Sequence, residues 1–430
     1  MSPGRLQGVA RARRAPAGRC HALAHLSDGP ALKRAFPRQR SDAAGGVAGG
    51  TQEADGQNLE APLQDLHARL KEQRYRPPPL RRVHIPNAPG KTRPIGISAF
   101  EDKVVQDAVR EVLAAIYEPD FLQCAYGFRP GRSAHDAMRT RKRHVEGGEG
   151  RWSCEADMVS CFDSGDRTER KKRLAVRVAD GSRLRRMGTC LHVGVLDGDE
   201  MVEPELGTVQ GAVLAPVLGN VYWHDGLDRW LATEGKPRLR GKATLLRYGD
   251  DCILGFVREA DARRGLAGLE QRLGRFGLTL HPDTTRLWPC WRPPTMPQDG
   301  QGPAPCDFVG FTFYWRRTRT GHWRMGCKPR RASLRRAKQA VYDGCRRHRH
   351  QPVEAQHAAL SRRLRGHCHD CGVSGNVRSL LRLVEATKRA WSKWRCRRSQ
   401  RTRLTWERCA ALLRQRPLPH PRITVRIWGV

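Results

Sequence analysis

Two adjacent aspartates stand in a tight turn past the middle of the chain. Apolar segments lie on both sides of Gly249-Asp250-Asp251 within the run Leu245–Phe256. Apolar runs bounded by turn formers predict two short strands of a hairpin, with both carboxylates at its tip. Two acids side by side are costly to bury without a counter-charge, so a divalent cation is their natural partner. Mg²⁺ prefers one or two carboxylates together with substrate phosphates, and the pair therefore predicts a phosphate-handling metal site.

A third carboxylate can join this pair from an upstream strand. The stretch Trp152–Asp163 is short and mostly apolar, and it carries Asp157. Three converging carboxylates fit a two-metal site for phosphoryl transfer, in which the ions hold the attacking and the leaving oxygens. Glu155 shares a face with Asp157 under strand alternation and stays an alternative. A solvated acidic loop is the simpler interpretation of any single acidic pair.

The charge of the chain indicates a polyanionic partner. The formal net charge is +36 and the sequence pI is about 10.8. Residues 316–430 hold 31 Lys and Arg against 5 Asp and Glu, a net charge of +26. A solvated basic face is the alternative, but so large an imbalance repels itself in a compact domain unless a polyanion neutralises it. Nucleic acid is therefore favoured over a membrane surface.

Composition also bears on the compartment. No apolar stretch approaches the ~20 residues that span a bilayer, and the Arg-rich N-terminus has no apolar core for a signal peptide. The 14 cysteines lack regular spacing, which argues against a disulfide scaffold and for a reducing cytosol. Cys368 and Cys371 form a Cys-x-x-Cys, but Cys396 and Cys409 follow at unrelated spacing, so buried positions are favoured over a zinc site.

Periodicity predicts the elements that position these residues. Residues 1–57, rich in Ala, Gly, Arg and Pro, predict a poorly ordered lead, and residues 292–305 predict an exposed loop. The remaining pattern predicts helices over 58–77, 100–117, 213–231, 259–276, 328–349, 353–365 and 377–398, and strands over 81–86, 92–97 and 308–313.

Ordered motifs along the chain resemble those of a reverse transcriptase, and more specifically a bacterial group II intron-encoded reverse transcriptase/maturase. The resemblance extends over about residues 58–427. The motifs are Gly90–Ile97, Tyr126–Ser133, Gly207–Gly211 with Leu214–Pro216 and Asn220, Tyr248–Asp251, Gly277–Pro282, Phe308–Phe311, Gly372–Asn376, Arg397–Gln400 and Leu404–Arg408.

The resemblance implies an α+β right-hand polymerase fold followed by a basic α-helical region. The implied domains are a lead over 1–57, fingers over 58–130, a palm with the catalytic carboxylates over 131–312, and a helical thumb/maturase region that binds RNA over 313–430.

The resemblance also assigns roles to residues. Catalysis and the binding of two Mg²⁺ ions, with Mn²⁺ as an alternative, fall to Asp157, Asp250 and Asp251. Nucleotide binding falls to Arg93 with Lys91 as the alternative cation, Phe162, Gln210 and Tyr248. Nucleic-acid binding falls to Arg129, Arg132, Phe308, Gly310, Arg397 and Arg398. The simpler alternatives are a core position for Phe162, a core strand for Phe308 and Gly310, and solvated side chains for Arg129 and Arg132. Trp391, Trp394 and Trp406 are expected to pack in cores more than to stack on bases.

The implied function is RNA-directed DNA synthesis in the bacterial cytoplasm, with deoxynucleoside triphosphates, an RNA template and a DNA primer. Binding of group II intron RNA and assistance to its splicing are also implied, without a membrane or a disulfide partner; the oligomeric state is not specified. Four departures from the family pattern weaken the polymerase expectation: Thr284 where relatives usually have Lys, Val209 for Pro, Cys161 for a frequent aromatic and Gly249 for Ala or Cys. The family lysine is thought to deliver a proton to pyrophosphate, and losing a general acid costs about 10²–10⁴ in rate. The rivals are a splicing cofactor with a dead polymerase and another palm enzyme such as a nucleotide cyclase.

Overall fold

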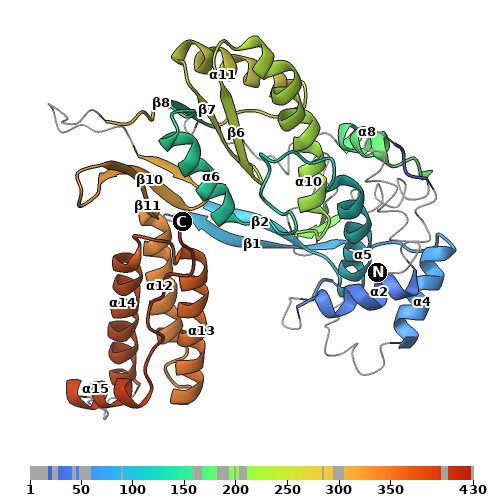
Figure 1. Ribbon diagram of the computed structural model, residues 1–430. Coiled ribbons are helices and arrows are strands. Elements are labelled where there is room, and N and C mark those ends of the chain that lie inside the picture. Colours follow the sequence, from blue (N-terminus) through green and yellow to red (C-terminus); the bar gives the residue numbers. More distant parts are fainter. Residues whose placement is uncertain are drawn as a thin grey trace. The chain divides into compact units, whose positions relative to one another are not determined.

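The computed structural model describes most of the chain (Figure 1). The described residues are 18–21, 28–40, 45–47, 60–88, 91–156, 158, 167–181, 193–197, 200–202, 211–282, 285–293, 305–398 and 405–427. The chain divides into two compact units, of which the first comprises Met1–Arg132, Cys154–Leu254 and Arg258–Leu287 and the second Ser133–Ser153, Gly255–Val257 and Trp288–Val430. Within the described residues, no helix combines the length and the apolar character that crossing a membrane requires.

The first unit contains a helix where a poorly ordered lead was expected. Helix α2 (Gly29–Ala35) and a short 3₁₀ turn, η2 (Phe36–Arg38), bury Leu32 and Phe36. The carboxylate of Asp28 accepts a hydrogen bond from Ala31 N at 3.0 Å and caps the helix. The prediction of disorder over 1–57 is therefore wrong for this segment, because its few apolar residues pack on a core that sequence periodicity does not reveal.

That core is shared with two further helices. Helix α4 (Glu60–Lys71) buries Leu63, Leu66 and Leu70, and α5 (Phe100–Tyr117) adds Phe100, Val104, Val105 and Ala108. The prediction for 100–117 is confirmed at both ends, whereas the predicted helix over 58–77 ends earlier, at Lys71; residues 58 and 59 lie outside the described residues.

A four-stranded sheet follows α4. Strands β1 (Leu80–Ala88) and β2 (Lys91–Ile97) are antiparallel, and β1 also pairs in parallel with β4 (Val195–Asp197). The sheet order is β2-β1-β4-β5, with β5 (Glu200–Val202) at the edge. The predicted strand pair over 81–97 is confirmed.

The C-terminal half of α5 packs against α8 (Arg167–Arg177) and α10 (Ala215–Trp223) through Val109, Leu113, Leu174 and Leu218, among others. After α10 the backbone continues in two π-helical turns, η3 (His224–Asp228) and η4 (Leu231–Gly235), and a 3₁₀ turn, η5 (Lys236–Arg238). The prediction of helical structure over 213–231 is confirmed, but the hydrogen-bonding pattern after α10 becomes π-helical, which apolar spacing alone does not predict.

A second four-stranded sheet has the order β6-β7-β3-β8. Its strands are β6 (Ala243–Tyr248), β7 (Asp251–Phe256), β3 (Trp152–Ala156) and β8 (Arg286–Pro289). Helix α11 (Glu259–Gly274) follows β7 and buries Leu269 and Leu273, as its predicted stripe requires.

The second unit contains α6 (Ala134–Glu146) and a three-stranded antiparallel sheet of order β11-β10-β9. Its strands are β9 (Cys306–Phe308), β10 (Phe311–Arg317) and β11 (Trp323–Pro329). The predicted single strand over 308–313 is wrong, because Val309 and Gly310 turn the chain with positive φ and separate two paired strands.

Three basic helices form a bundle in this unit, α12 (Arg331–Arg347), α13 (Val353–Cys371) and α14 (Val377–Cys396), with α15 (Trp406–Gln415) at one end (Figure 1). Val341, Leu360, Leu364, Leu383 and Trp391 form its core. The three predicted helices are confirmed, although α12 begins three residues later than expected because Lys328 and Pro329 belong to β11, and α13 continues past 365.

Candidate active site

The two central aspartates lie at the turn between β6 and β7. Gly249 and Asp250 form the turn, and Gly249 has a φ of 69°, which glycine adopts without steric cost. Asp250 is half-buried, and Asp251 begins β7 with an exposed side chain. The strands on both sides are largely buried, so the predicted hairpin with both carboxylates at its tip is confirmed.

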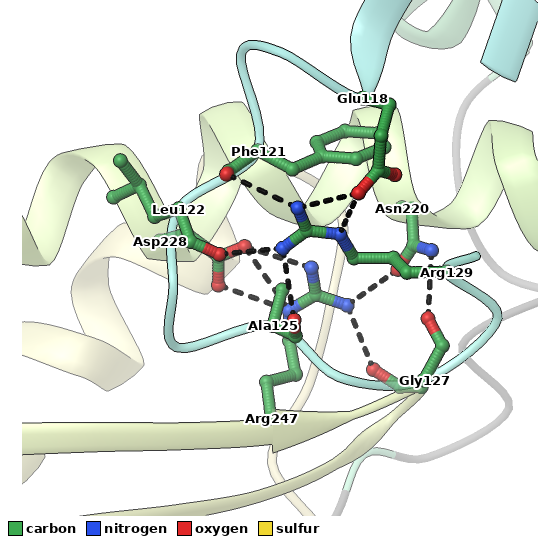
Figure 2. Close-up of polar contacts among 10 residues, drawn as sticks. Glu118, Phe121, Leu122, Ala125, Gly127, Arg129, Asn220, Asp228 and Arg247 are labelled. Atoms are coloured by element: carbon green, nitrogen blue, oxygen red, sulfur yellow. Dashed lines mark hydrogen bonds and ion pairs between the residues drawn. The ribbon is translucent and has the colours of Figure 1, made fainter. Parts of the chain in front are cut away.

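Strand β6 buries an arginine two residues before this turn. Arg247 donates from Nε to Asp228 Oδ1 at 2.9 Å and from Nη2 to Oδ2 at 2.7 Å, and both side chains are almost fully buried. Its Nη1 donates to Asn220 Oδ1 at 2.8 Å and to the Gly249 carbonyl at 3.1 Å (Figure 2). Burial disfavours the charged guanidinium, but the attraction and hydrogen bonds of Asp228 outweigh it and raise the pKa of Arg247. The charged arginine therefore fixes the carbonyl next to Asp250.

Sequence reasoning did not single out Arg247 or Asp228. The available signal was an arginine inside an otherwise apolar strand, since a buried guanidinium requires a carboxylate partner. Nothing in the sequence says which acid supplies it, because Asp228 lies 19 residues away on a π-helical turn.

The Tyr-Gly-Phe segment lies against the same turn. Tyr126 N donates to Arg247 O at 2.8 Å, and Asn220 Nδ2 donates to Gly127 O at 2.9 Å. A Cβ built on Gly127 would stand 2.3 Å from Gly249 N, nearer than real Cβ atoms approach any atom. Only glycine at 127 therefore allows this contact between the two backbones.

Phe128 places an exposed aromatic ring beside the turn. Its φ of 59° lies in the left-handed region, which non-glycine residues seldom adopt and which persists where the surroundings enforce it. Its side chain is 58% exposed, and its ring centroid lies 6.4 Å from that of Tyr248. A Cβ on Gly249 would lie 3.1 Å from this ring. The ring thus lies beside Gly249 and Tyr248 and is largely exposed.

Arg129 has an internal role, which revises the expectation that it binds template phosphates. It is 8% exposed and donates to Glu118 Oε1 at 2.7 and 3.0 Å and to the carbonyls of Leu122, Ala125 and Phe121 at 2.7, 2.9 and 3.4 Å (Figure 2). Its guanidinium also lies 5.4 Å from the centre of the Phe121 ring. These contacts occupy the donors of the guanidinium and hold together the loop between Glu118 and Arg129.

Replacing Arg129 with Ala is expected to lower the free energy of unfolding by about 3 kcal/mol, because three loop carbonyls and Glu118 lose their donor. The matched change is Arg132→Ala, because Arg132 is half-buried, contacts Gln123 and stacks over Tyr126 at 5.3 Å. It should cost less than about 1 kcal/mol. Urea denaturation followed by circular dichroism measures both; equal losses would contradict the internal role.

The neighbours of Asp157, the third predicted carboxylate, lie close to the hairpin. Strand β3 lies next to β7, and Cys252 Sγ donates to Ala156 O at 3.3 Å. The residues adjacent to Asp157 and Asp251 therefore contact each other. Several predicted residues lie outside the described ranges, namely Asp157, Phe162 and Gln210 with Cys161, Val209 and Thr284, and the side chain of Lys91 is not described either.

The strand that carries Arg93 lies against the loop that follows Gln210. Arg93 is exposed on β2. Gly211 has a φ of 112°, and a Cβ there would stand 2.5 Å from Gly96 O and 2.9 Å from the Ile95 side chain. Glycine at 211 thus lets this loop approach β2 closely.

A buried polar network holds the same loop to α5. Asp102 Oδ2 accepts from Gln106 Nε2 at 2.7 Å, and Tyr75 OH approaches Asp102 Oδ1 at 3.5 Å. Gln106 Oε1 in turn accepts from Leu214 N at 3.3 Å. Burial raises the pKa of Asp102 to about 6, against hydrogen bonds that lower it.

This raised pKa predicts a pH-dependent stability. Between the ordinary carboxyl pKa of 3.8 and about 6, the folded protein binds the proton that the unfolded chain releases. The Asp102 contribution is therefore complete below that window and is lost as pH rises through it. Relative to Asp102→Asn, which does not titrate, the wild type should lose roughly 2 kcal/mol between pH 4 and pH 7. Melting temperatures of both proteins at each pH test this, and parallel curves would contradict it.

In the second unit, the predicted nucleic-acid-binding residues Phe308 and Gly310 differ in exposure. Phe308 is buried, whereas Gly310 is exposed and has a φ of 78°. The Gly310 carbonyl accepts from Arg330 N at 3.1 Å, and Arg330 also pairs with Asp307 at 2.8 Å. Any contact with nucleic acid at this turn would therefore come from Gly310 rather than from the Phe308 ring.

Arg397 and Arg398 are exposed at the end of α14. Arg397 lies over the Trp394 ring at 5.7 Å, and Arg398 Nη2 donates to His350 O at 3.1 Å. Trp391 is 2% exposed and packs in the bundle, as expected for a core tryptophan.

The described residues contain no group of three His, Cys, Asp or Glu side chains that could hold a metal ion. Asp250 and Asp251 nevertheless offer the oxygen ligands that Mg²⁺ prefers, on a turn whose Gly249 carbonyl is hydrogen-bonded to Arg247. The donor set therefore fits a hard cation and needs a further carboxylate to complete it.

A hairpin carrying adjacent carboxylates, next to a strand that ends one residue before another aspartate, is the arrangement of a nucleic-acid polymerase palm. A family model described as reverse transcriptase (RNA-dependent DNA polymerase) matches residues 85–313, and the chain belongs to this family, with its palm and fingers fold. The expected resemblance to group II intron-encoded reverse transcriptases/maturases is confirmed by the relatives.

Similarity extends to proteins of bacteria and fungi. The Group II intron-encoded protein LtrA of Lactococcus lactis subsp. cremoris is 37% identical over 179 residues, covering 41% of this chain and 29% of that protein. Protein YkfC of Escherichia coli (strain K12) is 32% identical over 261 residues, 53% of this chain and 68% of that protein. The "Uncharacterized 91 kDa protein in cob intron" of Schizosaccharomyces pombe is 34% identical over 177 residues, 41% of this chain and 21% of that protein. The chain thus spans about three tenths of the length of LtrA.

Proposed function

We propose that this chain is an RNA-directed DNA polymerase of the group II intron type, which extends a DNA primer on an RNA template. One observation carries the proposal: Arg247, which pairs with the buried Asp228, donates a hydrogen bond to the Gly249 carbonyl and thereby fixes the turn at Asp250 and Asp251. A turn held by a fully hydrogen-bonded buried pair presents its carboxylates in one position, as two-metal chemistry requires.

Asp157, Asp250 and Asp251 would hold two Mg²⁺ ions, with Mn²⁺ as an alternative. When bound, the ions supply charge neutralisation at the triphosphate and lower the pKa of the primer 3′-hydroxyl. The chain contributes the position of the carboxylates. The contact between Ala156 and Cys252 supports the inclusion of Asp157, because it joins the residues next to two of the acids.

The nucleotide would lie between the fingers strand and the turn. Arg93, exposed on β2, would bind the triphosphate, with Lys91 as the alternative cation. Phe162 would lie under the sugar and exclude a 2′-hydroxyl, and Gln210 would approach the base through its glycine-flanked loop. Tyr248, next to the acids, would support the floor of the site.

We also propose a role for the bundle formed by α12, α13 and α14. Its helices would act as the thumb and as the surface that binds intron RNA during splicing. The net charge of +26 over residues 316–430 supports this, since each phosphate neutralised by Lys or Arg releases a counter-ion. Arg132, Gly310, Arg397 and Arg398 are the residues that we expect to contact nucleic acid.

A second function is favoured by one departure from the family. Thr284 stands where relatives usually have a lysine that is thought to protonate pyrophosphate. A chain that has lost this acid but keeps its basic helices would act in splicing alone, as an RNA-binding cofactor.

Primer extension separates the two functions. With poly(rA)/oligo(dT), dTTP and Mg²⁺, the wild-type protein should incorporate nucleotides, and Asp157→Ala should abolish incorporation. Glu270→Ala, at an exposed acid on α11, serves as the matched control and should retain it. Absence of incorporation by wild type together with tight, salt-sensitive RNA binding would favour the splicing cofactor. Full activity in Asp157→Ala would defeat the site assignment.

A further inference from the structure

The helical bundle of the second unit contains a cavity that the polymerase site does not use. It has a volume of about 330 Å³ and lies between α12, α13 and α14. That volume is at the lower end of the range for small-molecule sites, which suits a single ring system with its substituents.

We call this cavity the bundle pocket, and its floor is apolar. Leu360, Cys345 and Trp391 line it, and all three side chains are buried. Gln356 is the polar residue of the floor, but its Oε1 accepts from Trp391 Nε1 at 2.9 Å and its Nε2 donates to Arg349 O and Gln351 O at 3.1 and 2.7 Å. The floor therefore presents hydrocarbon and aromatic surface, on which a flat apolar ring packs without unpaired hydrogen-bonding groups.

The rim is cationic. Arg347, Arg362, Arg363 and His348 line the opening, and all are exposed. Within the part of the chain that the structure describes, no carboxylate forms an ion pair with Arg347 or Arg362. Unpaired guanidinium groups at the edge of an apolar cavity attract a phosphate, which they can bind through two parallel N–H groups.

One glycine keeps the entrance open. Gly344 has no side chain, and Arg363 extends across it to donate from Nη1 to Ala340 O. A Cβ at 344 would come within 3.2 Å of Arg363 Nη1. Opposite, Ala359 is exposed and lines the same opening, so a larger side chain at 359 fills the cavity without replacing a core residue.

We propose that the bundle pocket binds one unpaired nucleotide of an RNA strand, with the base against Leu360 and Trp391 and the adjoining phosphates on Arg347 and Arg362. A duplex keeps its bases stacked and offers only phosphates, whereas an unpaired nucleotide brings both the ring that the floor fits and the anion that the rim fits. The inference rests on the proposed function only in taking RNA as the partner.

The test compares two RNA hairpins of equal length, one fully paired and one with a single bulged 4-thiouridine, binding to the full chain at fixed salt. The wild type should bind the bulged hairpin about tenfold more tightly. Ala359→Phe should remove this preference and keep the affinity for the paired hairpin. Arg362→Ala should weaken binding of the bulged hairpin more than Arg382→Ala, which removes the same charge from an exposed position on α14 outside the pocket.

Crosslinking gives a second readout that does not depend on a variant. Irradiation of the wild-type complex should join the bulged 4-thiouridine to peptides of α12, α13 or α14, identified by mass spectrometry. Crosslinks confined to other segments, an unchanged preference in Ala359→Phe, or equal affinity of wild type for both hairpins would each overturn the proposal.

Primer extension measured in parallel keeps the two proposals apart. A wild type that discriminates the hairpins but extends no primer leaves the bundle pocket standing and removes the polymerase. A wild type that extends primers without discriminating does the reverse.

Discussion

Primer extension by Asp250→Asn is expected to fall by about 10³-fold or more. Asparagine has nearly the shape of aspartate but no charge, so it cannot neutralise a divalent cation, and the loss of several kcal/mol of charge stabilisation corresponds to that factor. The fold should survive the change, because Gly249 and Arg247 set the turn through backbone and buried contacts that do not involve the Asp250 side chain.

Two measurements make this result specific. Asp65→Asn removes the same charge from an exposed acid on α4 and should leave the rate unchanged. Melting temperature and affinity for the RNA template should match wild type in both variants. Retention of a tenth or more of the rate by Asp250→Asn would rule out this residue as an essential carboxylate.

Arg247→Met is expected to lower the free energy of unfolding by about 3–5 kcal/mol, because it leaves Asp228 as an uncompensated buried charge. Activity should fall with it, since the Gly249 carbonyl and Asn220 also lose their donor. Arg263→Met, which breaks a surface pair with Glu259, should cost less than about 1 kcal/mol.

The double variant Arg247→Met/Asp228→Leu separates stability from positioning. Removing both charges should recover most of the lost stability, because no buried charge then remains unpaired. Primer extension should stay low, since neither substitute can bond the turn. Chemical denaturation and extension rates of Arg247→Met, Asp228→Leu and the double variant complete the cycle. Recovery of full activity in the double variant would show that the pair stabilises the fold without positioning the turn.

The parts of the fold that were predictable depend on local chemistry. The hairpin around Asp250 follows from glycine and acidic turn formers between apolar runs, and helix α5 follows from a long regular stripe that begins and ends at turn residues. Both elements are specified within their own residues, which is why the prediction agrees with the structure almost to the residue.

The parts that were missed depend on partners far away in sequence. Helix α2 is seven residues long and is stabilised by contacts with α4 and α5, so its own pattern is weak. The turn at Val309 requires a positive φ that a β-branched residue does not suggest. Arg129 was interpreted as exposed because its acceptors, Glu118 and three carbonyls, are chosen by the loop's path and not by its composition.

The close packing of Gly127, Phe128 and Gly249 has a consequence for the engineering of this chain. Gly127 meets the backbone of Gly249, and the Phe128 ring occupies the space where a side chain at 249 would begin. A Cβ at position 249 would lie 3.1 Å from the Phe128 ring, on a backbone with a φ of 69°, so Ala at 249 requires the ring to shift and its effect depends on residue 128. A substitution at 249 is therefore expected to be tolerated better when residue 128 changes with it than when 249 is varied alone.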